Sequence, residues 1–365
     1  VRLNPVTGLP TGNPQAVALD PVVPRSSLSI AGLDGVGNWL FYVAAPSGRN
    51  QIFYIASAGD QFSNWRREQR LPLSSIVRSV ESVQANVYRV TANPNTPAQS
   101  LVYLADVFFI GTVGDRNESE ILMQRFYVNP NNGNLLTLSD TRADRPLGVT
   151  QERFLPAVND EVAQKDPDQN VWRVRHLDWA SIDGGWNTDP TAPDIDIKIN
   201  GVSILREPNP GNPTQFVLQR PIVDPQTGLM QFTYNEPVVG GGGQILAVRN
   251  RGLIVVDPSN GTVRFVNFAP RLNDIVTVTY RPRVYRISAT APGSAGTYSQ
   301  LRAVFQRTMN PRHNTANTGA SPVRKGVNNG AANPSERPPL DRVWLFFRRS
   351  SPPPNSSGNY FFKTL

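Results

Sequence analysis

The amino-acid sequence predicts an all-β, mainly antiparallel fold, and three features lead to this prediction. Runs of β-prone aromatic and aliphatic residues recur along the chain, as at 39–43 and 344–347. Turn motifs rich in Asx, Pro and Gly separate these runs, and the chain contains 33 Pro and 28 Gly. Helical periodicity is scarce, and only residues 74–90 and 153–165 could each form a short helix. We therefore expect β-sandwich domains, or propeller-like hairpins, with an extended N-terminal arm.

Hairpins with a shared pattern are expected near both ends of the chain. Residues 39–55 contain a Trp-Leu-Phe-aromatic run, a turn with Ser-Gly and a second β-prone run, and residues 344–362 repeat this form. A looser third copy spans residues 107–123. Two β-prone runs around a Gly-containing turn are typical of a hairpin. The two terminal hairpins could pair with each other, which would make the middle of the chain an insertion.

A second repeat, Asx-Pro-x-x-Gly, marks turns. It occurs at residues 4–8, 129–133, 224–228 and 257–261. Asx caps the turn, Pro presets φ at the next position, and Gly takes the left-handed conformation that closes the hairpin. The last three copies are flanked by apolar residues and therefore predict hairpins.

These patterns divide the chain into four segments. The predicted order is an extended N-terminal arm at 1–27, a β domain at 28–170, a β-sandwich-like domain at 171–287 and a basic C-terminal region at 288–365. The last segment contains a long loop at 309–340, which is rich in Asn, Gly, Pro and Ala, and the terminal hairpin that could pair with 28–56.

The composition argues against an enzyme. The chain has no Cys, which removes disulfides, thiolate nucleophiles and Cys-ligated metals, and it has only two His. A Ser-His-Asp triad would need one of those two, and no Gly-x-Ser-x-Gly motif is present. We expect no catalytic residues and no organic cofactor. No apolar run approaches the roughly 18 residues of a transmembrane helix.

Charge is unevenly distributed along the chain. Residues 281–365 contain 13 Lys or Arg against 2 Asp or Glu, a net charge of +11, so the net charge of +8 leaves −3 for the rest. Residues 150–200 contain 10 acids and 5 bases. The basic end could meet an acidic patch of a neighbouring copy, or an anionic cell surface or glycan. Specific nucleic-acid recognition is not expected, because the Arg residues are scattered and no recognition motif is present.

Arg also outnumbers Lys by 32 to 4. A GC-rich genome and a need for bidentate Arg pairs in packed polar interfaces both remain open as explanations.

Two stretches resemble known β-modules. Residues 253–280, with an Asp-x-x-x-Gly hairpin, Thr-Val-x-Phe, an Ala-Pro turn and a closing Val-Thr-Val-x-Tyr strand, resemble modules of tailed-phage structural proteins and bacterial surface proteins. The Trp-Leu-Phe hairpins look like blade strands of sialidase-type β-propellers, and residues 181–186 and 57–65 resemble that family's Asp-box with departures in spacing. The Asp-box is a structural turn, so this resemblance implies a fold and does not by itself imply catalysis.

One acidic cluster could bind a cation. Its members lie in a Gly/Pro/Thr-rich stretch and are Asp183, Asp189, Asp194 and Asp196. Oxygen-rich loops of this kind can hold Ca²⁺, although the spacing fits no EF-hand. Solvated turn acids and a glycosidase carboxylate pair are the alternatives. His176 lies in a strand-like run and is expected to be a packed or surface residue rather than a ligand.

The aromatic hairpins are also the candidate assembly elements. Aromatic residues at alternating and adjacent positions place large apolar side chains on both faces of a strand, which indicates burial in a layered domain or at a subunit contact. The residues assigned to assembly are Trp344, Phe346, Arg348, Arg349, Trp39 and Phe41.

The sequence therefore favours a non-enzymatic structural subunit that forms homo-oligomers or polymers in an extracellular filament, tube or virion component. It would assemble through the N-terminal arm and the basic C-terminal region. The alternative is a secreted propeller-like surface protein that binds glycans or hydrolyses glycosides. A third hypothesis is a domain of a longer adhesin.

Overall fold

The computed structural model is all-β, as predicted: the residues that it describes form strands joined by turns and contain no α-helix. The described residues are 2–3, 10–11, 23–33, 35–58, 65–91, 101–114, 119–139, 154–167, 170–180, 194–288, 297–307, 340–350 and 359–364.

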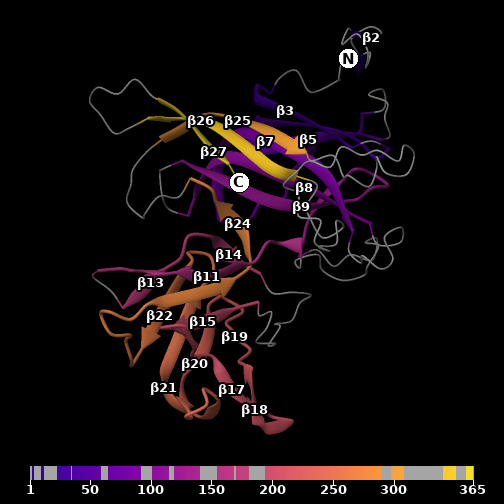
Figure 1. The fold of residues 1–365 in the computed structure, drawn as a ribbon. Coiled ribbons are helices and arrows are strands. Elements are labelled where there is room, and N and C mark those ends of the chain that lie inside the picture. The colour runs from indigo at the N-terminus through magenta and orange to yellow at the C-terminus, as the bar shows by residue number, and fades with distance from the viewer. Residues whose placement is uncertain are drawn as a thin grey trace, which may run out of the picture. The chain divides into compact units, whose positions relative to one another are not determined.

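The chain divides into two compact units, which we call unit 1 and unit 2. Unit 1 consists of Val1–Leu73, Val77–Thr137 and Thr290–Leu365, and unit 2 of Ser74–Ile76 and Leu138–Ala289. Figure 1 shows the indigo N-terminal strands and the yellow C-terminal strands in unit 1. The segment predicted as a sandwich-like domain, 171–287, lies within unit 2.

Unit 1 contains three main groups of antiparallel strands and a short N-terminal pair. In the first sheet the order is β3 (Arg25–Leu33), β4 (Gly37–Ala44), β5 (Gln51–Ala58) and β6 (Gln69–Arg70). The second group contains β7 (Val77–Thr91), β8 (Leu101–Val113), β9 (Glu120–Val128) and β10 (Leu135–Thr137). The terminal sheet contains β25 (Thr297–Arg307), β26 (Leu340–Ser350) and β27 (Asn359–Thr364), and the short pair is β1 (Arg2–Leu3) with β2 (Pro10–Thr11).

The outer edge of β7 is sealed by side chains of β3. The backbone N–H groups of Val83 and Ala85 donate to Ser27 Oγ (2.7 Å) and Ser29 Oγ (3.1 Å). An exposed row of unpaired N–H groups is a template for pairing with another chain. Serine hydroxyls that bind these groups therefore close this edge of unit 1.

Unit 2 contains two larger antiparallel sheets and two strand pairs. In the first sheet the order is β12 (Gln164–Lys165), β13 (Val171–Arg173), β22 (Thr262–Val266), β21 (Ile245–Asp257), β20 (Met230–Val239) and β19 (Ile222–Val223). In the second it is β11 (Val158–Val162), β23 (Val276–Tyr280), β15 (Asp196–Ile199) and β16 (Val202–Ser203). The pairs are β17 (Arg206–Asn209) with β18 (Asn212–Leu218), and β14 (Leu177–Trp179) with β24 (Pro282–Arg286).

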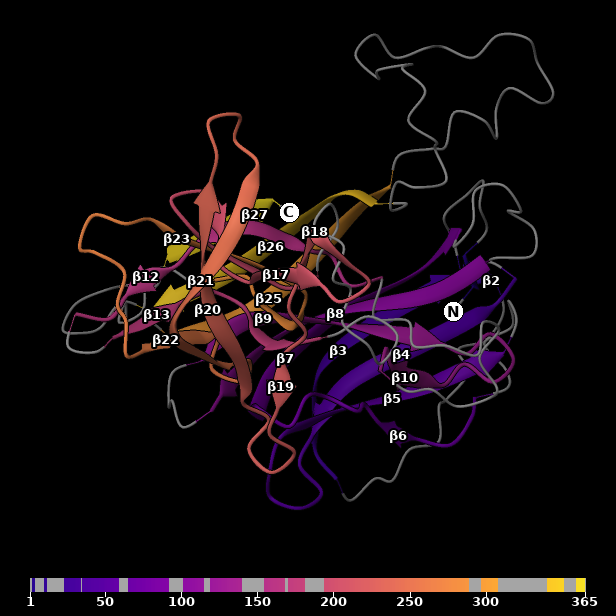
Figure 2. The same cartoon turned by 90° about the horizontal axis from the view of Figure 1, so that it is seen from below.

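One hydrophobic core joins the two larger sheets of unit 2. Phe232, Ile254 and Val256 of the first sheet belong to the same buried cluster as Ile197 and Val278 of the second. Apolar residues from two sheets that share one core are the defining feature of a sandwich arrangement. Figure 2 shows the strands of this unit from below.

The Asx-Pro-x-x-Gly motifs close hairpins as predicted. Gly133, Gly228 and Gly261 have φ values of 68°, 70° and 62°. In each turn the Asx side chain accepts a backbone N–H two residues later; for Asp224 Oδ1 the donor is Gln226, at 2.8 Å. The copy at residues 4–8 lies outside the described residues.

The three aromatic hairpins also form, as β4–β5, β8–β9 and β26–β27. The predicted pairing of the two terminal hairpins with each other is wrong, because β4–β5 and β26–β27 belong to different sheets.

The two helix predictions are wrong. Residues 77–91 form the long strand β7, and the described part of 153–165 contains β11 and β12. Of the predicted arm at 1–27, the structure describes β1, β2 and residues 23–27, of which the last three are the start of β3. The predicted loop at 309–340 lies outside the described residues apart from its last residue, the first of β26.

Candidate assembly surface

The outer face of the terminal sheet brings together several residues that the sequence assigned to assembly. Inward and outward side chains alternate along β26, where Val343, Leu345 and Phe347 are buried and Phe346 is 41% exposed. Strand β25 adds Val304, which is 54% exposed and pairs in register with Trp344. We call this surface the terminal-sheet face and define it by Arg302, Val304, Trp344, Phe346 and Arg348.

The inner face of the same sheet holds it in place within unit 1. The rings of Tyr298 and Phe347 pack edge to face with centroids 5.6 Å apart, and Phe305 packs on Phe108 of β8 at 5.9 Å. The backbone N–H of Tyr298 donates to Ser119 Oγ at 3.1 Å. These contacts bury one face of the sheet, whereas on the other face Phe346, Val304 and Arg302 are exposed and Trp344 and Arg348 are half-buried.

The terminal-sheet face is positively charged. Arg302 pairs in register with Phe346, and Arg348 lies two residues further along β26. Within the part of the chain that the structure describes, neither guanidinium forms an ion pair with a carboxylate, and Arg348 Nε is buried without a hydrogen-bond partner. A buried donor without a partner costs free energy, so this position lowers the stability of the terminal sheet.

Trp39 and Phe41, the other aromatic residues assigned to assembly, lie in the core of unit 1. Both are fully buried, and Trp39 Nε1 donates to the Gly133 carbonyl oxygen at 2.8 Å. Their side chains are therefore not part of a surface in this structure. Strand β26 includes Arg349, whose side chain lies outside the described residues.

The predicted calcium cluster is described only in part, because Asp183 and Asp189 lie outside the described residues. Asp194 is completely buried and forms an ion pair with Arg281 at 3.4 Å. Asp196 accepts a hydrogen bond from Ser203 Oγ at 2.6 Å, and burial raises its pKa above the ordinary value. Among the described residues no group of three or more His, Asp or Glu is arranged to hold a metal ion. Calcium binding stays a prediction.

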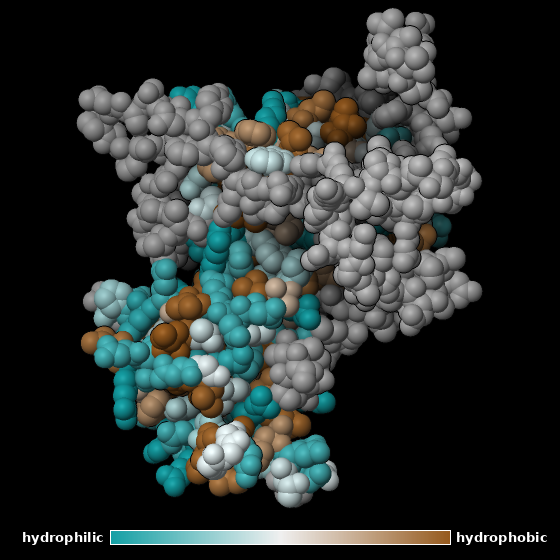
Figure 3. All heavy atoms as spheres, viewed as in Figure 1, coloured by the Kyte–Doolittle hydropathy of each residue, from teal (hydrophilic) through white to brown (hydrophobic). Residues whose placement is uncertain are grey.

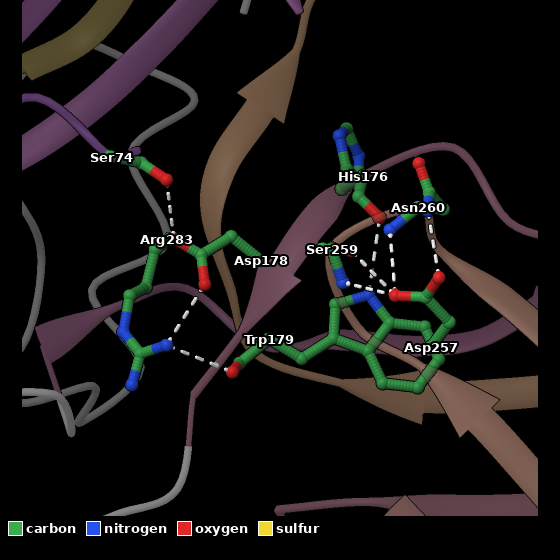
Figure 4. A network of polar contacts seen from close by, with 8 residues as sticks. All are labelled: Ser74, His176, Asp178, Trp179, Asp257, Ser259, Asn260 and Arg283. Carbon is green, nitrogen blue, oxygen red and sulfur yellow. Dashed lines mark hydrogen bonds and ion pairs between the residues drawn. The ribbon is translucent and has the colours of Figure 1, made fainter. Parts of the chain in front are cut away.

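A polar network around β14 explains His176 and its neighbours (Figure 4). Asp178 accepts from Ser74 Oγ (2.7 Å) and from Arg283 Nη1 (3.0 Å), and Arg283 also donates to the Trp179 carbonyl. The His176 carbonyl accepts from Trp179 Nε1 at 3.1 Å. The nearby Asp257 accepts from the turn residues that follow it in the sequence.

The imidazole of His176 is packed as well. Its Nδ1 accepts the backbone N–H of Arg286 at 3.0 Å, and its ring lies 5.4 Å from that of Tyr285. Close by, the Tyr280 hydroxyl donates to Glu161 Oε2 at 2.6 Å, and burial raises the pKa of Tyr280. These side chains hold strands together, and the network needs no substrate or ligand to account for it.

The acidic segment is largely neutralised inside unit 2. Asp160, Asp166, Asp178 and Asp194 each form an ion pair, with Lys198, Arg173, Arg283 and Arg281 respectively. Arg281 and Arg283 belong to the stretch with the high positive charge, so part of the sequence asymmetry is internal pairing. The described acids of 150–200 therefore offer little free negative charge to a neighbour.

Other large hydrophobic residues are exposed in both units. In unit 1 they are Leu28 and Ile30 of β3, which are 58% and 63% exposed. Those of unit 2 are interspersed with hydrophilic residues on the face seen in Figure 3, and they are Val162, Val202, Ile222, Val223, Val239, Leu246, Leu272 and Ile275. Val239 and Leu246 lie together at the tip of the β20–β21 hairpin. The signal in the sequence is the apolar residues on both sides of the Gly240–Gly243 tract.

Comparison with known proteins yields no match: no protein-family model, no curated protein and no solved structure is similar to this chain. No helix among the described residues has the length and apolar character needed to span a membrane.

Proposed function

We propose that this chain is a non-enzymatic structural subunit that assembles with copies of itself into an extracellular filament, tube or virion component. The observation that carries the proposal is the terminal-sheet face, where Phe346 and Val304 are exposed next to two Arg residues without carboxylate partners among the described residues. Exposed apolar patches bordered by polar groups mark sites of protein association. Aromatic residues and Arg are also enriched in the energetically important parts of interfaces.

The charge of this face favours a contact with a different surface of the next copy. Two copies of the face placed against each other would bring Arg302 and Arg348 near their equivalents, and like charges across an interface are unfavourable. Contacts between two different surfaces generate rings if the rotation closes and open filaments if it does not. The arm at 1–27 would be a further contact, as the sequence predicts.

Two observations support a non-enzymatic role: the composition of the chain and the polar network around His176. The chain has no Cys and two His, and His176 and the described acids around it are engaged in contacts that stabilise unit 2.

The experiment is a comparison of Phe346→Lys with wild-type protein by sedimentation velocity over a range of protein and salt concentrations. The substitution places a third positive charge on the face and removes an aromatic contact, so we expect a loss of assembly. Leu272→Lys is the matched control, because Leu272 is 86% exposed and lies in unit 2. Equal assembly of Phe346→Lys and wild type would rule out this face as the contact.

A further inference from the structure

The distal half of the β20–β21 hairpin is a two-stranded ribbon that leaves the sheet. Strand β22 pairs with β21 only along Leu253–Asp257, and β19 pairs with β20 only at Met230 and Gln231. Beyond these positions β20 and β21 pair only with each other among the described strands. We call residues 235–251 the ribbon, and Figure 2 shows these strands running side by side to a turn that projects from unit 2.

A bulge marks the start of the ribbon. The register between the two strands shifts between Tyr234 and Asn235, opposite Gly252. A Cβ on Gly252 would lie 2.5 Å from the Val266 carbonyl oxygen, and its N–H is capped by Asn250 Oδ1 at 3.0 Å. Bulges bend a strand and end its pairing with a neighbour. The divergence of β21 from β22 is therefore built into the sequence.

The ribbon exposes apolar side chains. Leu246 is 60% exposed and Val239 is 49% exposed, on either side of the Gly240–Gly243 turn. An isolated two-stranded hairpin is marginally stable in water, and three or more strands or packing on another element are needed for independent stability. A further strand beside β21 would stabilise the ribbon by hydrogen bonds and by burial of Leu246, which lies on that strand.

The two edges of the ribbon differ in what they can accept. On β20, Pro237 has no N–H, and Asn235 already donates from its backbone to the Ile204 carbonyl (2.9 Å) and from Nδ2 to the Arg206 carbonyl (2.8 Å). On β21, the stretch 245–251 contains no Pro and pairs with β20 alone among the described strands. Proline on an edge blocks strand addition, so β21 has the open edge.

An open strand edge can bind a further strand but not a lipid surface. Unpaired backbone groups need hydrogen-bond partners, which hydrocarbon cannot supply. Strand addition satisfies them and gives pockets to alternate side chains. The ribbon can supply this strand to a second copy of itself, because its open edge carries no directly opposed like charges in an antiparallel pairing centred on Val248. In that register Arg249 lies opposite Ala247 of the second copy, and Arg251 opposite its Ile245.

A local ion pair further limits repulsion between the two ribbons. Arg251 Nε donates to Glu236 Oε2 at 2.7 Å, across the ribbon, which leaves Arg249 as the one cation of the stretch 245–251 without an ion pair. We propose that β21 of two copies pair antiparallel along residues 245–251, about a two-fold axis, to give the strand order β20–β21–β21–β20. This inference rests on the proposed self-assembly and adds a symmetric contact to it.

The natural absence of Cys makes a direct test available. In the Val248→Cys variant the two new thiols would face each other across the axis, at the Cα separation of about 4.5–5.5 Å that opposite residues of antiparallel strands adopt. This separation suits a disulfide. Val239→Cys is the matched control, because its strand is separated from the axis by β21. We expect mild oxidation to give a covalent dimer of Val248→Cys and little of Val239→Cys.

A second variant tests the same contact without a covalent cross-link. Val248→Lys opposes two ammonium groups at the axis, and we expect it to weaken dimer formation by about ten-fold or more, whereas Val239→Lys changes it little. Sedimentation equilibrium measures both. If wild-type protein assembles but Val248→Cys cross-links no faster than Val239→Cys, or Val248→Lys dimerises like wild type, the ribbon inference is wrong and the proposed function stands. If wild-type protein is monomeric at all concentrations, both fail.

Discussion

A buried ion pair in unit 1 gives the most quantitative prediction about the fold. Arg125 on β9 binds Asp106 on β8 through two hydrogen bonds, Nε to Oδ1 at 2.6 Å and Nη2 to Oδ2 at 2.9 Å. The side chains are only 13% and 8% exposed. Tyr88 on β7 donates its hydroxyl to Asp106 at 3.0 Å, and its ring lies 5.7 Å from the guanidinium carbon. The pair therefore connects three neighbouring strands.

Removal of one partner leaves an uncompensated charge in the core. We expect Asp106→Ala to lower the free energy of unfolding by about 3–5 kcal/mol, which is the usual cost of breaking a buried pair. The double variant Asp106→Val with Arg125→Met removes both charges and fills the space with apolar groups. It should regain most of that loss, because the desolvation of two charges is no longer required.

Urea unfolding, followed by intrinsic fluorescence, measures these differences as shifts of the midpoint at constant slope. The exposed pair Arg251–Glu236 is the internal control, since its side chains are 43% and 42% exposed. Arg251→Ala should cost no more than about 1 kcal/mol, as expected for a surface ion pair. A loss for Asp106→Ala as small as that of the control, or a double variant no more stable than the single one, would show that this ion pair does not behave as a buried charge pair.

Three further predictions concern strain and titration. Gly252→Ala should lower the free energy of unfolding by about 1–3 kcal/mol in the same urea experiment, because the new Cβ would meet the Val266 carbonyl. Gly241 has open space around it, so Gly241→Ala should change the free energy of unfolding by less than about 0.5 kcal/mol. Burial raises the pKa of Asp196 above its ordinary value of 3.8, so the stability that its protonated form contributes is present below that pH and is lost as pH rises through the raised pKa. The stability of Asp196→Asn relative to wild type should therefore increase with pH, and thermal unfolding at several pH values measures this difference. Burial raises the pKa of Tyr54 to about 12, so its contribution to stability is lost as pH rises from 10 through 12, and Tyr54→Phe should lack the phenolate absorbance step near pH 12.

Local chemistry made much of the β structure predictable. Asx-Pro-x-x-Gly fixes the turn through a side-chain hydrogen bond and a residue with positive φ, and both act within five residues. The described copies of that motif therefore form where the sequence places them, and so do the aromatic hairpins. Pairings between distant segments do not leave such local marks. This is why the partner of β26 was expected in the N-terminal hairpin and is β25 instead.

Strand β7 shows why a pattern can mislead. Its valines at 77, 80 and 83 are three residues apart, which resembles one face of a helix. The structure has register shifts between Val77 and Ser79 and between Val80 and Ser82. Each shift inserts a residue into a strand whose side chains otherwise alternate, so a period of two becomes a spacing of three.

The candidate surface was predicted in part. Phe346 and Arg348 were identified from the basic, aromatic C-terminal hairpin, but Trp39 and Phe41 share the same motif and are buried. The motif is the same in both hairpins, and the difference is whether another layer covers the strand. Burial by a second layer depends on tertiary packing, which the local sequence does not contain.

The most direct test of the account is electron microscopy of negatively stained wild-type protein across a series of salt concentrations. We expect ordered polymers or shells in the wild-type protein and their loss in Phe346→Lys. The wild-type assembly should depend on salt, because Arg residues border the contact. Dispersed monomers at every salt and protein concentration would contradict the proposal that this chain is an assembling structural subunit.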